Sequence, residues 1–497
     1  PAASESDNSL ERLKHVKGLI DHVQKQEGVI SQDIISLYTS DDVEGITGGI
    51  NVDRLLRSSP DNKDQLEHVK ERLADHPILK GMIFNPETGG IAVYIPVEAK
   101  HYSYNVRTAV QDFWSEQVPD SIGTVHITGL PVAEETFGVE MFKQMAISAP
   151  MAFVLIGLLM LFFFRSLSLV TWSLVQAAIT VMITMGGLIG LGFTVHIMSS
   201  MIPIFLLPIA VVDSIHILSD FTDRMGPDDD FKTVLSGVYE DIFYPILFTS
   251  VTSSAGFFSL ITTGIPPVEV FGGAVGFGIL LAFVLTLTVL PAGASLWQPR
   301  STSEGEDTII ARILNCPPEG FCLSRDYPKS VIAGLVVLLV VGLFGMSLIQ
   351  VNDNPTRWFF SDHPIRQADR YINQTFAGSY PAYLKLSKDD QEWYDPETLG
   401  QLARVTDEIE AMDEVGKVTA LPDLVSKIHH EIMKDRAEGP LPSSDRAVSQ
   451  YLFLYENSGN PQDLFRLVTA SGDAVNVWFN MKSGDNRNMA KVKKKTE

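Results

Sequence analysis

An acidic residue and a histidine lie inside one of the most apolar runs of this chain of 497 residues. Asp213 and His216 belong to the sequence SMIPIFLLPIAVVDSIHIL, residues 200–218. A charged carboxylate in the middle of a membrane helix costs about 3 kcal/mol, so such residues are rare and mark functional sites. The spacing of three residues places both side chains on one face of a helix. The pair predicts a relay that takes up and releases protons inside a membrane, and proton-coupled transport is the first hypothesis that follows.

Two prolines precede Asp213, and a cluster of hydroxyl side chains lies on the following apolar run. Pro203 and Pro208 each remove a backbone donor, so we expect them to disrupt the helix before Asp213. The carbonyl groups that the prolines free need hydrogen-bond donors, which neighbouring hydroxyl groups can supply. The supporting polar residues predicted on this basis are Ser214, Thr249, Ser250, Thr252 and Ser253.

Each of these residues also has a purely structural interpretation. His216 can form a hydrogen bond within a helix bundle without titrating, and Asp213 can stay permanently neutral. The hydroxyl cluster can hold helices together, which is a common role of small polar residues in membranes. The sequence leaves both interpretations open.

Six runs of residues are apolar and long enough to cross a bilayer as helices. They are residues 146–164, 167–191, 194–218, 242–262, 268–297 and 330–350. Their number and length exclude a soluble protein with six buried helices. We therefore expect an α-helical polytopic membrane protein.

The Lys and Arg residues of the connections predict how this protein lies in the membrane. They follow the first, third and fifth runs, whereas the short connections after the second and fourth runs have none. Basic connections stay in the cytoplasm. Residues 1–145 and 351–497 are then expected on the opposite side, periplasmic or extracellular. The basic residues of the connections are Arg165, Arg224, Lys232, Arg300, Arg312, Arg325 and Lys329.

The charge balance and the cysteines exclude several classes of function. The formal net charge is −22, and both polar regions are more acidic than basic, which disfavours nucleic acid as a partner. Cys316 and Cys322 both lie in the connection 298–329 without a neighbouring histidine, so we expect free thiols and no metal site. Residues 307–315 in this connection form an amphipathic pattern, expected on the inner leaflet. We predict no cofactor besides the proton gradient and no enzymatic activity.

The two polar regions contain matching segments, which predict an internal repeat. The helical pattern of residues 10–29 recurs with the same spacing in residues 399–418. A glycine turn with alternating apolar residues, at 79–97, is matched at 464–481. Two copies of one plan would require a helix before residue 1 and five further membrane helices after the second region. We therefore interpret the sequence as a fragment that lacks both ends, built from the parallel repeats of a transporter.

Several of these segments together resemble one superfamily. PIAVVDSIHIL, residues 208–218, is similar to the acidic motif of the resistance–nodulation–division (RND) superfamily, although a glycine usual before the aspartate is absent. FTSVTSSAGFFSL, residues 248–260, resembles its hydroxyl-rich stretch. The helix from Phe271, with TVLPAGASLW, and the segments ITGLP and NDNPTRWFFSDHPIRQADRYI also fit. The order of the motifs is closest to the MMPL-like branch, whose membrane block is related to sterol-sensing domains.

The resemblance implies a plan for the whole chain, with α/β porter domains of ferredoxin-like, βαβ type outside the membrane. Each half would contain one such domain and its membrane helices, which gives a two-fold internal repeat. The expected parts are a first porter domain at 1–145, a five-helix block at 146–297, a cytoplasmic linker at 298–329, a helix opening the second repeat at 330–350, and a second porter domain at 351–497.

The resemblance also implies a function. The chain resembles exporters that are driven by proton influx and move hydrophobic or amphipathic molecules out of the bacterial inner membrane. Porter domains shorter than those of drug-efflux relatives favour sterol-like, hopanoid-like or other lipids as substrates. Asp213 and His216 would form the proton relay, and the implied partners are the membrane, the lipid substrate, further copies of the chain and periplasmic proteins. The alternatives are a sterol- or lipid-sensing regulator that transports nothing, and an accessory of protein export.

Overall fold

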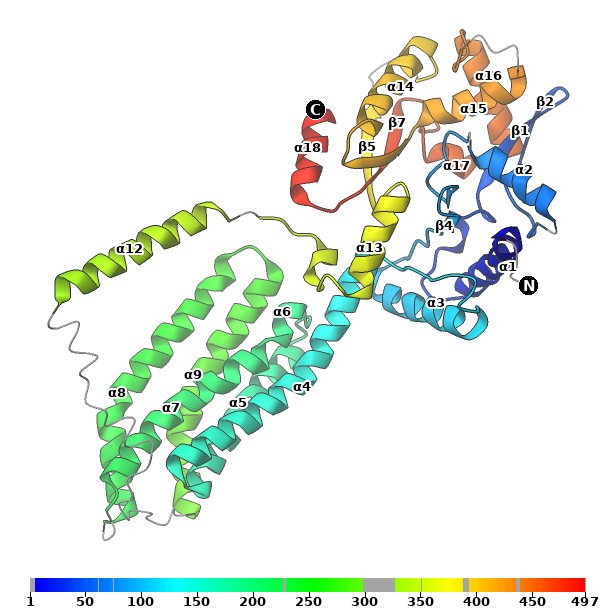
Figure 1. The fold of residues 1–497 in the computed structure, drawn as a ribbon. Coiled ribbons are helices and arrows are strands. Elements are labelled where there is room, and N and C mark those ends of the chain that lie inside the picture. Colours follow the sequence, from blue (N-terminus) through cyan, green and yellow to red (C-terminus); the bar gives the residue numbers. More distant parts are fainter. Residues whose placement is uncertain are drawn as a thin grey trace. The chain divides into compact units, whose positions relative to one another are not determined.

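The protein divides into two compact units, each described here by itself. The structure, a computed structural model, describes residues 5–60, 62–74, 76–226, 229–297, 327–349, 351–387, 393–434 and 439–496. Residues 1–137 and 349–497 make up one unit, called the polar unit, and residues 138–348 make up the other, the helical unit (Figure 1). The two cysteines and the amphipathic pattern at 307–315 lie outside the described residues.

Six helices of the described residues are long and apolar enough to cross a membrane, as the sequence predicts. The third span is interrupted after its first turn, and the fourth ends in a short 3₁₀ helix. Their bounds are α4 Leu130–Phe164, α5 Leu167–Gly190, α6 Ile197–Ser200 with α7 Ile202–Arg224, α8 Phe231–Phe258 with η3 Ser259–Thr262, α9 Pro266–Leu296 and α12 Pro328–Ser347.

Two of these helices begin well before the apolar runs that predict them. α4 starts at Leu130 instead of residue 146, and its 35 residues span about 52 Å, more than the roughly 30 Å of a hydrocarbon core. α8 starts at Phe231 instead of residue 242, because the side chain of Asp230 accepts a hydrogen bond from Thr233 N at 3.0 Å and caps the helix. Hydropathy detects only the apolar part of a helix that can lie in the membrane, so it does not predict the polar residues by which α4 and α8 extend beyond that part.

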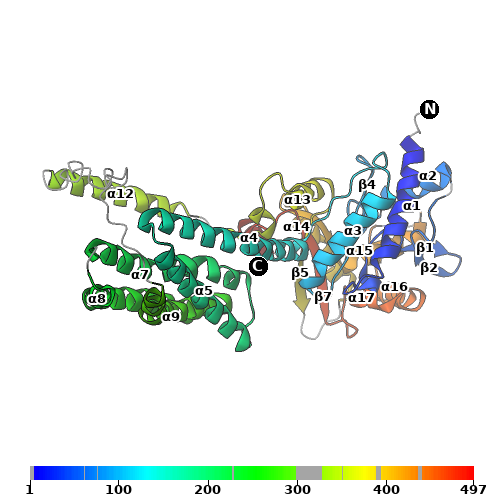
Figure 2. The ribbon, with the colours of Figure 1, turned by 90° about the horizontal axis from the view of Figure 1, so that it is seen from below.

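α9 is the central helix of the helical unit. It packs against α5, α7 and α8, which run beside it in both views (Figures 1 and 2). Glycine permits close approach at this centre: a Cβ atom at Gly276 would lie 2.8 Å from the Phe258 ring, and one at Gly293 would lie 2.1 Å from Trp172. α12, by contrast, is exposed along its length within the described residues.

The first part of the polar unit consists of helices around two antiparallel hairpins. Leu13, Val16 and Ile20 of the first helix form its apolar core with buried residues of the second helix and of the loops. The strands pair as β1 with β2 and as β3 with β4. The elements are α1 Glu5–Val23, η1 Ser31–Asp33, β1 Asp41–Ile46, β2 Gly49–Arg54, α2 Lys63–Ala74, β3 Phe84–Asn85, β4 Gly90–Ile91, η2 Lys100–Tyr102 and α3 Ser103–Gln117.

The second part of the polar unit contains a three-stranded sheet with the order β5-β7-β6. Both outer strands are antiparallel to β7, so β5, α14 and β6 form a split β-α-β unit, a component of ferredoxin-like folds. The complete ferredoxin-like fold and the internal repeat stay predictions. The elements are η5 Pro355–Trp358, α13 Pro364–Thr375, β5 Tyr380–Ser387, α14 Pro396–Glu410, β6 Val415–Thr419, α15 Leu421–Met433, α16 Asp445–Ser458, α17 Pro461–Phe465, β7 Ala474–Met481 and α18 Asn486–Thr496.

The β1–β2 hairpin packs into the second part of the polar unit. Val43 and Ile50 belong to the core cluster of α14, α15, α16 and the three-stranded sheet. Contact is close at Gly45, where a Cβ atom would lie 2.0 Å from the carbonyl oxygen of Glu431. Segments about 380 residues apart therefore share one apolar core.

Candidate functional site

The helix that contains Asp213 begins after a break. α6 ends at Ser200, Met201 links it to α7, and Pro203 is the second residue of α7, where a missing N–H leaves no hydrogen bond unmade. Pro208 lies inside α7, and the helix continues past it to Arg224. The predicted disruption is thus present before Pro203, whereas at Pro208 the helix continues.

Asp213 is buried in the helical unit and has a neutral hydrogen-bond partner. Ser250 on α8 donates to Asp213 Oδ2 at 3.1 Å, and both side chains are buried. Among the described residues, no Lys or Arg forms an ion pair with Asp213. A carboxyl group in such surroundings can change its charge, because no fixed cation holds the ionised form.

His216 lies one turn beyond Asp213 on α7, but its side chain is exposed. We find no hydrogen bond between the two side chains in the described part of the chain. The helix places the imidazole near the carboxyl group, as the spacing predicts, and leaves it on the side that the other described helices do not cover. Its part in a relay stays a prediction.

Of the four hydroxyl residues predicted on α8, the structure brings Ser250 to Asp213. Thr249 and Thr252 are exposed and donate to carbonyl groups of their own helix, at Pro245 and Phe248. Ser253 is exposed as well. Successive residues of a helix turn by about 100°, so only one face of α8 can meet α7. The carbonyl groups around the prolines of α7 therefore do not bind Thr249 or Thr252.

The prediction misses several buried polar residues of this region, among them Ser254 and Gln176. Ser254, one turn after Ser250 on the same face of α8, donates to Gly276 O on α9 at 2.8 Å. Gln176 on α5 has no exposed surface, and its Oε1 accepts a hydrogen bond from Ser214 Oγ at 2.7 Å. The signal for Gln176 is present in the sequence: it is an amide within the apolar run 167–191, and such a group needs partners just as a carboxylate does.

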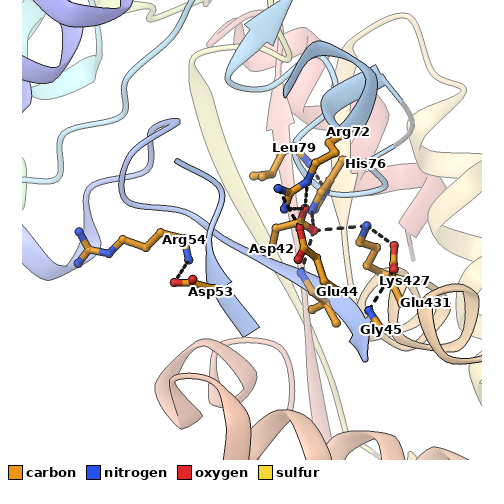
Figure 3. A network of polar contacts seen from close by, with 11 residues as sticks. Asp42, Glu44, Gly45, Asp53, Arg54, Arg72, His76, Leu79, Lys427 and Glu431 are labelled. Atoms are coloured by element: carbon orange, nitrogen blue, oxygen red, sulfur yellow. Dashed lines mark hydrogen bonds and ion pairs between the residues drawn. The ribbon is translucent and has the colours of Figure 1, made fainter. Parts of the chain in front are cut away.

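A second buried carboxylate lies in the polar unit. Asp42 on β1 bonds Arg72 Nε at 3.0 Å, His76 Nε2 at 3.2 Å and Lys427 Nζ at 3.3 Å (Figure 3). Glu44 and Glu431 bind the outer sides of these cations. We call these residues the Asp42 cluster: Asp42, Glu44, Arg72, His76, Lys427 and Glu431.

The histidine of the Asp42 cluster is held in one tautomer. Its Nδ1 accepts hydrogen bonds from the backbone N–H groups of Ile78 and Leu79, at 3.2 and 3.1 Å. Backbone N–H groups only donate, so the proton of a neutral His76 lies on Nε2 and is donated to Asp42. Burial by itself would raise the pKa of Asp42, but the bond from His76, the charge of Lys427 and the bond from Arg72 hold that pKa well below its ordinary value.

A groove of about 560 Å³ lies next to the Asp42 cluster, between β2 and α2. Its walls carry both signs of charge, among them Asp53, Arg54, Asp64 and His68. No group of three or more His, Cys, Asp or Glu side chains in the described residues is arranged to hold a metal ion. The mixed walls select no single ligand charge, so the groove does not define a binding site by itself.

The fold and the buried carboxyl group together define a class of protein. Six apolar helices among the described residues, with Asp213 in the interior of the helical unit, describe a multi-pass membrane protein with an ionisable group in its membrane part. The sequence model of the MMPL family matches residues 13–305, more than half of the chain. The chain belongs to the MMPL family, membrane transporters of the RND superfamily. No curated protein matches the sequence.

Proposed function

We propose that the protein is an exporter of hydrophobic or amphipathic molecules that is driven by the proton gradient. The observation that carries the proposal is Asp213: a carboxyl group buried within a membrane helix, bonded to the hydroxyl of Ser250 and to no cation among the described residues. Such intramembrane carboxyl groups mark proton relays and ion pathways. Membership of a transporter family supports the same assignment.

In the proposed cycle, Asp213 takes up a proton from the outside and releases it to the inside. Ser250 donates a hydrogen bond to the ionised carboxylate, and this bond weakens when the carboxyl group is neutral. The contact between α7 and α8 then differs between the two protonation states. That difference moves the helices, and the movement is passed on to the polar unit. His216, one turn away, exchanges the proton with Asp213.

The substrate class that we propose is lipids, sterol-like, hopanoid-like or other. Membership of the MMPL family supports this assignment. The basic connections of the helical unit, such as Arg165 and Arg224, support a location in the bacterial cytoplasmic membrane with the polar unit on the periplasmic side. In this proposal the polar unit consists of porter domains. Further copies of the chain and periplasmic proteins are the proposed partners.

The experiment that tests this function compares Asp213→Asn with wild type in liposomes. Proton entry under an imposed pH gradient is followed with an enclosed pH-sensitive dye, with and without candidate lipids. We expect lipid-stimulated entry in wild type and a loss of at least about 100-fold in the variant, the usual scale for removal of a proton-transfer group.

The matched control is Asp220→Asn, on the same helix. Asp220 is paired with Arg224 near the end of α7, and its removal should leave proton entry unchanged. Full activity of Asp213→Asn would refute the relay. An absence of proton entry in wild type with every lipid would refute transport and favour the sterol- or lipid-sensing regulator, or the accessory of protein export.

A further inference from the structure

Gln176 connects three helices at the level of Asp213. Its Nε2 lies 3.0 Å from Ala210 O on α7, 3.3 Å from Ala282 O on α9 and 2.6 Å from Thr286 Oγ1 on α9. Its Oε1 accepts from Ser214 Oγ on α7. One side chain of α5 therefore holds both α7 and α9.

The orientation of this amide is fixed by its partners. Carbonyl oxygens only accept, so the NH₂ group must face Ala210 and Ala282, and the oxygen must face Ser214. Both polar ends of the Gln176 side chain thus have hydrogen-bond partners, although the residue is fully buried. A buried amide without these partners would be costly, so Gln176 stabilises one arrangement of α5, α7 and α9.

α7 is held on two sides at the same level. Asp213 bonds Ser250 on α8, while the next residue, Ser214, bonds Gln176 on α5. The bond on the α8 side changes when Asp213 gains or loses a proton. The bonds on the α5 side involve amide, hydroxyl and carbonyl groups, which do not titrate in the physiological range.

α8 has its own fixed connections to α9. Tyr239 donates to Thr286 O at 2.9 Å, and Ser254 donates to Gly276 O. Thr286 therefore receives bonds from both α5 and α8, through its side chain and its carbonyl group. α9 is the common support, and in the apolar interior the titrating bond lies between α7 and α8.

We propose that Gln176 is a positioning residue: it fixes α7 to α5 and α9, so that the changing charge of Asp213 acts on the contact with α8. The inference rests on the proposed function and adds a residue to its machinery. Without Gln176, α7 would lose its side-chain hydrogen bonds to α5 and, through Gln176, its link to α9, so a change in the Asp213–Ser250 bond would be absorbed by movement of α7.

The test uses the full-length protein in liposomes and three substitutions of Gln176. Gln176→Leu removes all four bonds and keeps an apolar volume. We expect it to lower the maximal rate of proton entry at least about tenfold, equivalent to about 1.4 kcal/mol. Gln176→Asn keeps the amide on a shorter side chain, and we expect an intermediate rate.

The informative variant is Gln176→Glu. A protonated glutamic acid can donate to one of the carbonyl groups that Gln176 binds, whereas an ionised one faces their oxygen atoms without a donor. We expect its rate, relative to wild type, to recover as the pH falls from 8 to 5.5, while the rate of Gln176→Leu stays low at both. A merely structural role would lower the midpoint of thermal unfolding in detergent in step with the rate at each pH, whereas a positioning role changes the rate without a matching change of the midpoint.

The matched control is Thr180→Val. Thr180 is equally buried on α5, one turn from Gln176, but its hydroxyl bonds only the carbonyl group of Gln176 within the same helix. We expect its rate to stay within about twofold of wild type. Proton entry that depends on Asp213 but is unaffected in Gln176→Leu would overturn this inference and leave the proposed function intact. Wild-type entry that does not depend on Asp213 would overturn the proposed function itself.

Discussion

The two units of the protein each bury a carboxylate, and they treat it in opposite ways. Asp42 in the polar unit is surrounded by Arg72, Lys427 and the Nε2–H group of His76. Asp213 in the helical unit has the hydroxyl of Ser250 and, among the described residues, no ion pair with Lys or Arg; His216 lies one turn away. Both side chains are buried, so the difference lies in the partners.

The comparison separates a carboxylate with structural partners from the one to which we assign the proton relay. Two cations and a donor hold Asp42 ionised over the whole physiological range, because they lower its pKa more than burial raises it. Such a carboxylate stabilises the fold, and its charge does not change within the physiological pH range. A hydroxyl group holds the ionised form of a carboxyl group less strongly than a cation does. The charge of Asp213 can therefore change, as the proposed relay requires. We therefore expect substitution of Asp42 to affect stability, and substitution of Asp213 to affect transport.

The largest effect on stability is expected for Asp42→Asn. The substitution removes the counter-charge that the half-buried Arg72 and Lys427 share, although Glu44 and Glu431 stay as their partners, and we expect a cost of about 1.5–3 kcal/mol. The midpoint of thermal unfolding in detergent should fall by several degrees. Tryptophan fluorescence can follow it, since Trp393 lies in the core of the polar unit.

The control for this substitution is Asp53→Asn on the same hairpin. Asp53 forms an exposed pair with Arg57, and we expect the unfolding midpoint to stay at its wild-type value. The comparison would fail if Asp42→Asn unfolded like wild type, or if Asp213→Asn lowered the midpoint as much as Asp42→Asn does.

A smaller effect, on transport, is expected for Ser250→Ala. The ionised form of Asp213 loses its hydroxyl donor, and a hydrogen bond to a charged group contributes about 1.5–3 kcal/mol. We expect the rate of proton entry into liposomes to fall about tenfold, with an unchanged unfolding midpoint. Ser253→Ala is the matched control, because Ser253 is exposed on the same helix. An equal loss in both variants would show that the hydroxyl of Ser250 has no special role.

The smallest effect concerns a third carboxyl group, Asp423 in the first turn of α15. Burial raises its pKa to about 6, although it accepts a hydrogen bond from Ala420 N at 2.8 Å. A raised pKa means that the folded protein binds the proton more tightly than the unfolded chain. The stability that this proton contributes is complete below about pH 3.8 and is lost as the pH rises through about 6.

Asp423→Asn keeps the acceptor and removes the titration. Its unfolding midpoint should match that of wild type at pH 4 and exceed it at pH 7. The expected difference in the free energy of unfolding at pH 7 is on the order of 1 kcal/mol. Asp445→Asn, exposed in the first turn of α16, controls for the loss of a charge near a helix start. Identical differences between Asp423→Asn and wild type at both pH values would contradict the titration of Asp423.

The sequence predicts the membrane helices because hydropathy is a local property. A run of about 20 apolar residues has few alternatives to a membrane helix, and all six predicted runs are helical. The ends of α4 and α8 are less predictable, since polar residues such as Glu140 and Lys143 continue a helix outside the hydrocarbon. In the polar unit, residues 10–20 and 399–409 form helices as their spacing predicts. Around the glycine turn predicted within 79–97, strand structure is limited to two short strands, β3 and β4.

The candidate site divides in the same way. Asp213 stands out in the sequence because a carboxylate is rare in an apolar run, and the same signal marks Gln176. One of the four hydroxyl residues on α8, Ser250, contacts Asp213. The choice depends on the rotation of α8 about its axis relative to α7, and the spacing of residues along α8 does not determine that rotation.

The sequence by itself determined the membrane helices, the buried acid and the family, because each depends on residues close together in the chain. Tertiary structure alone decided the Asp42 cluster, whose members are scattered among many other charged residues of a water-exposed region. Lys427 reaches Asp42 because the β1–β2 hairpin packs on α15, far along the chain. It also decided that Gln176 holds Ser214, since that bond requires α5 and α7 to lie side by side. Packing between distant segments sets these partners, and no local pattern records it.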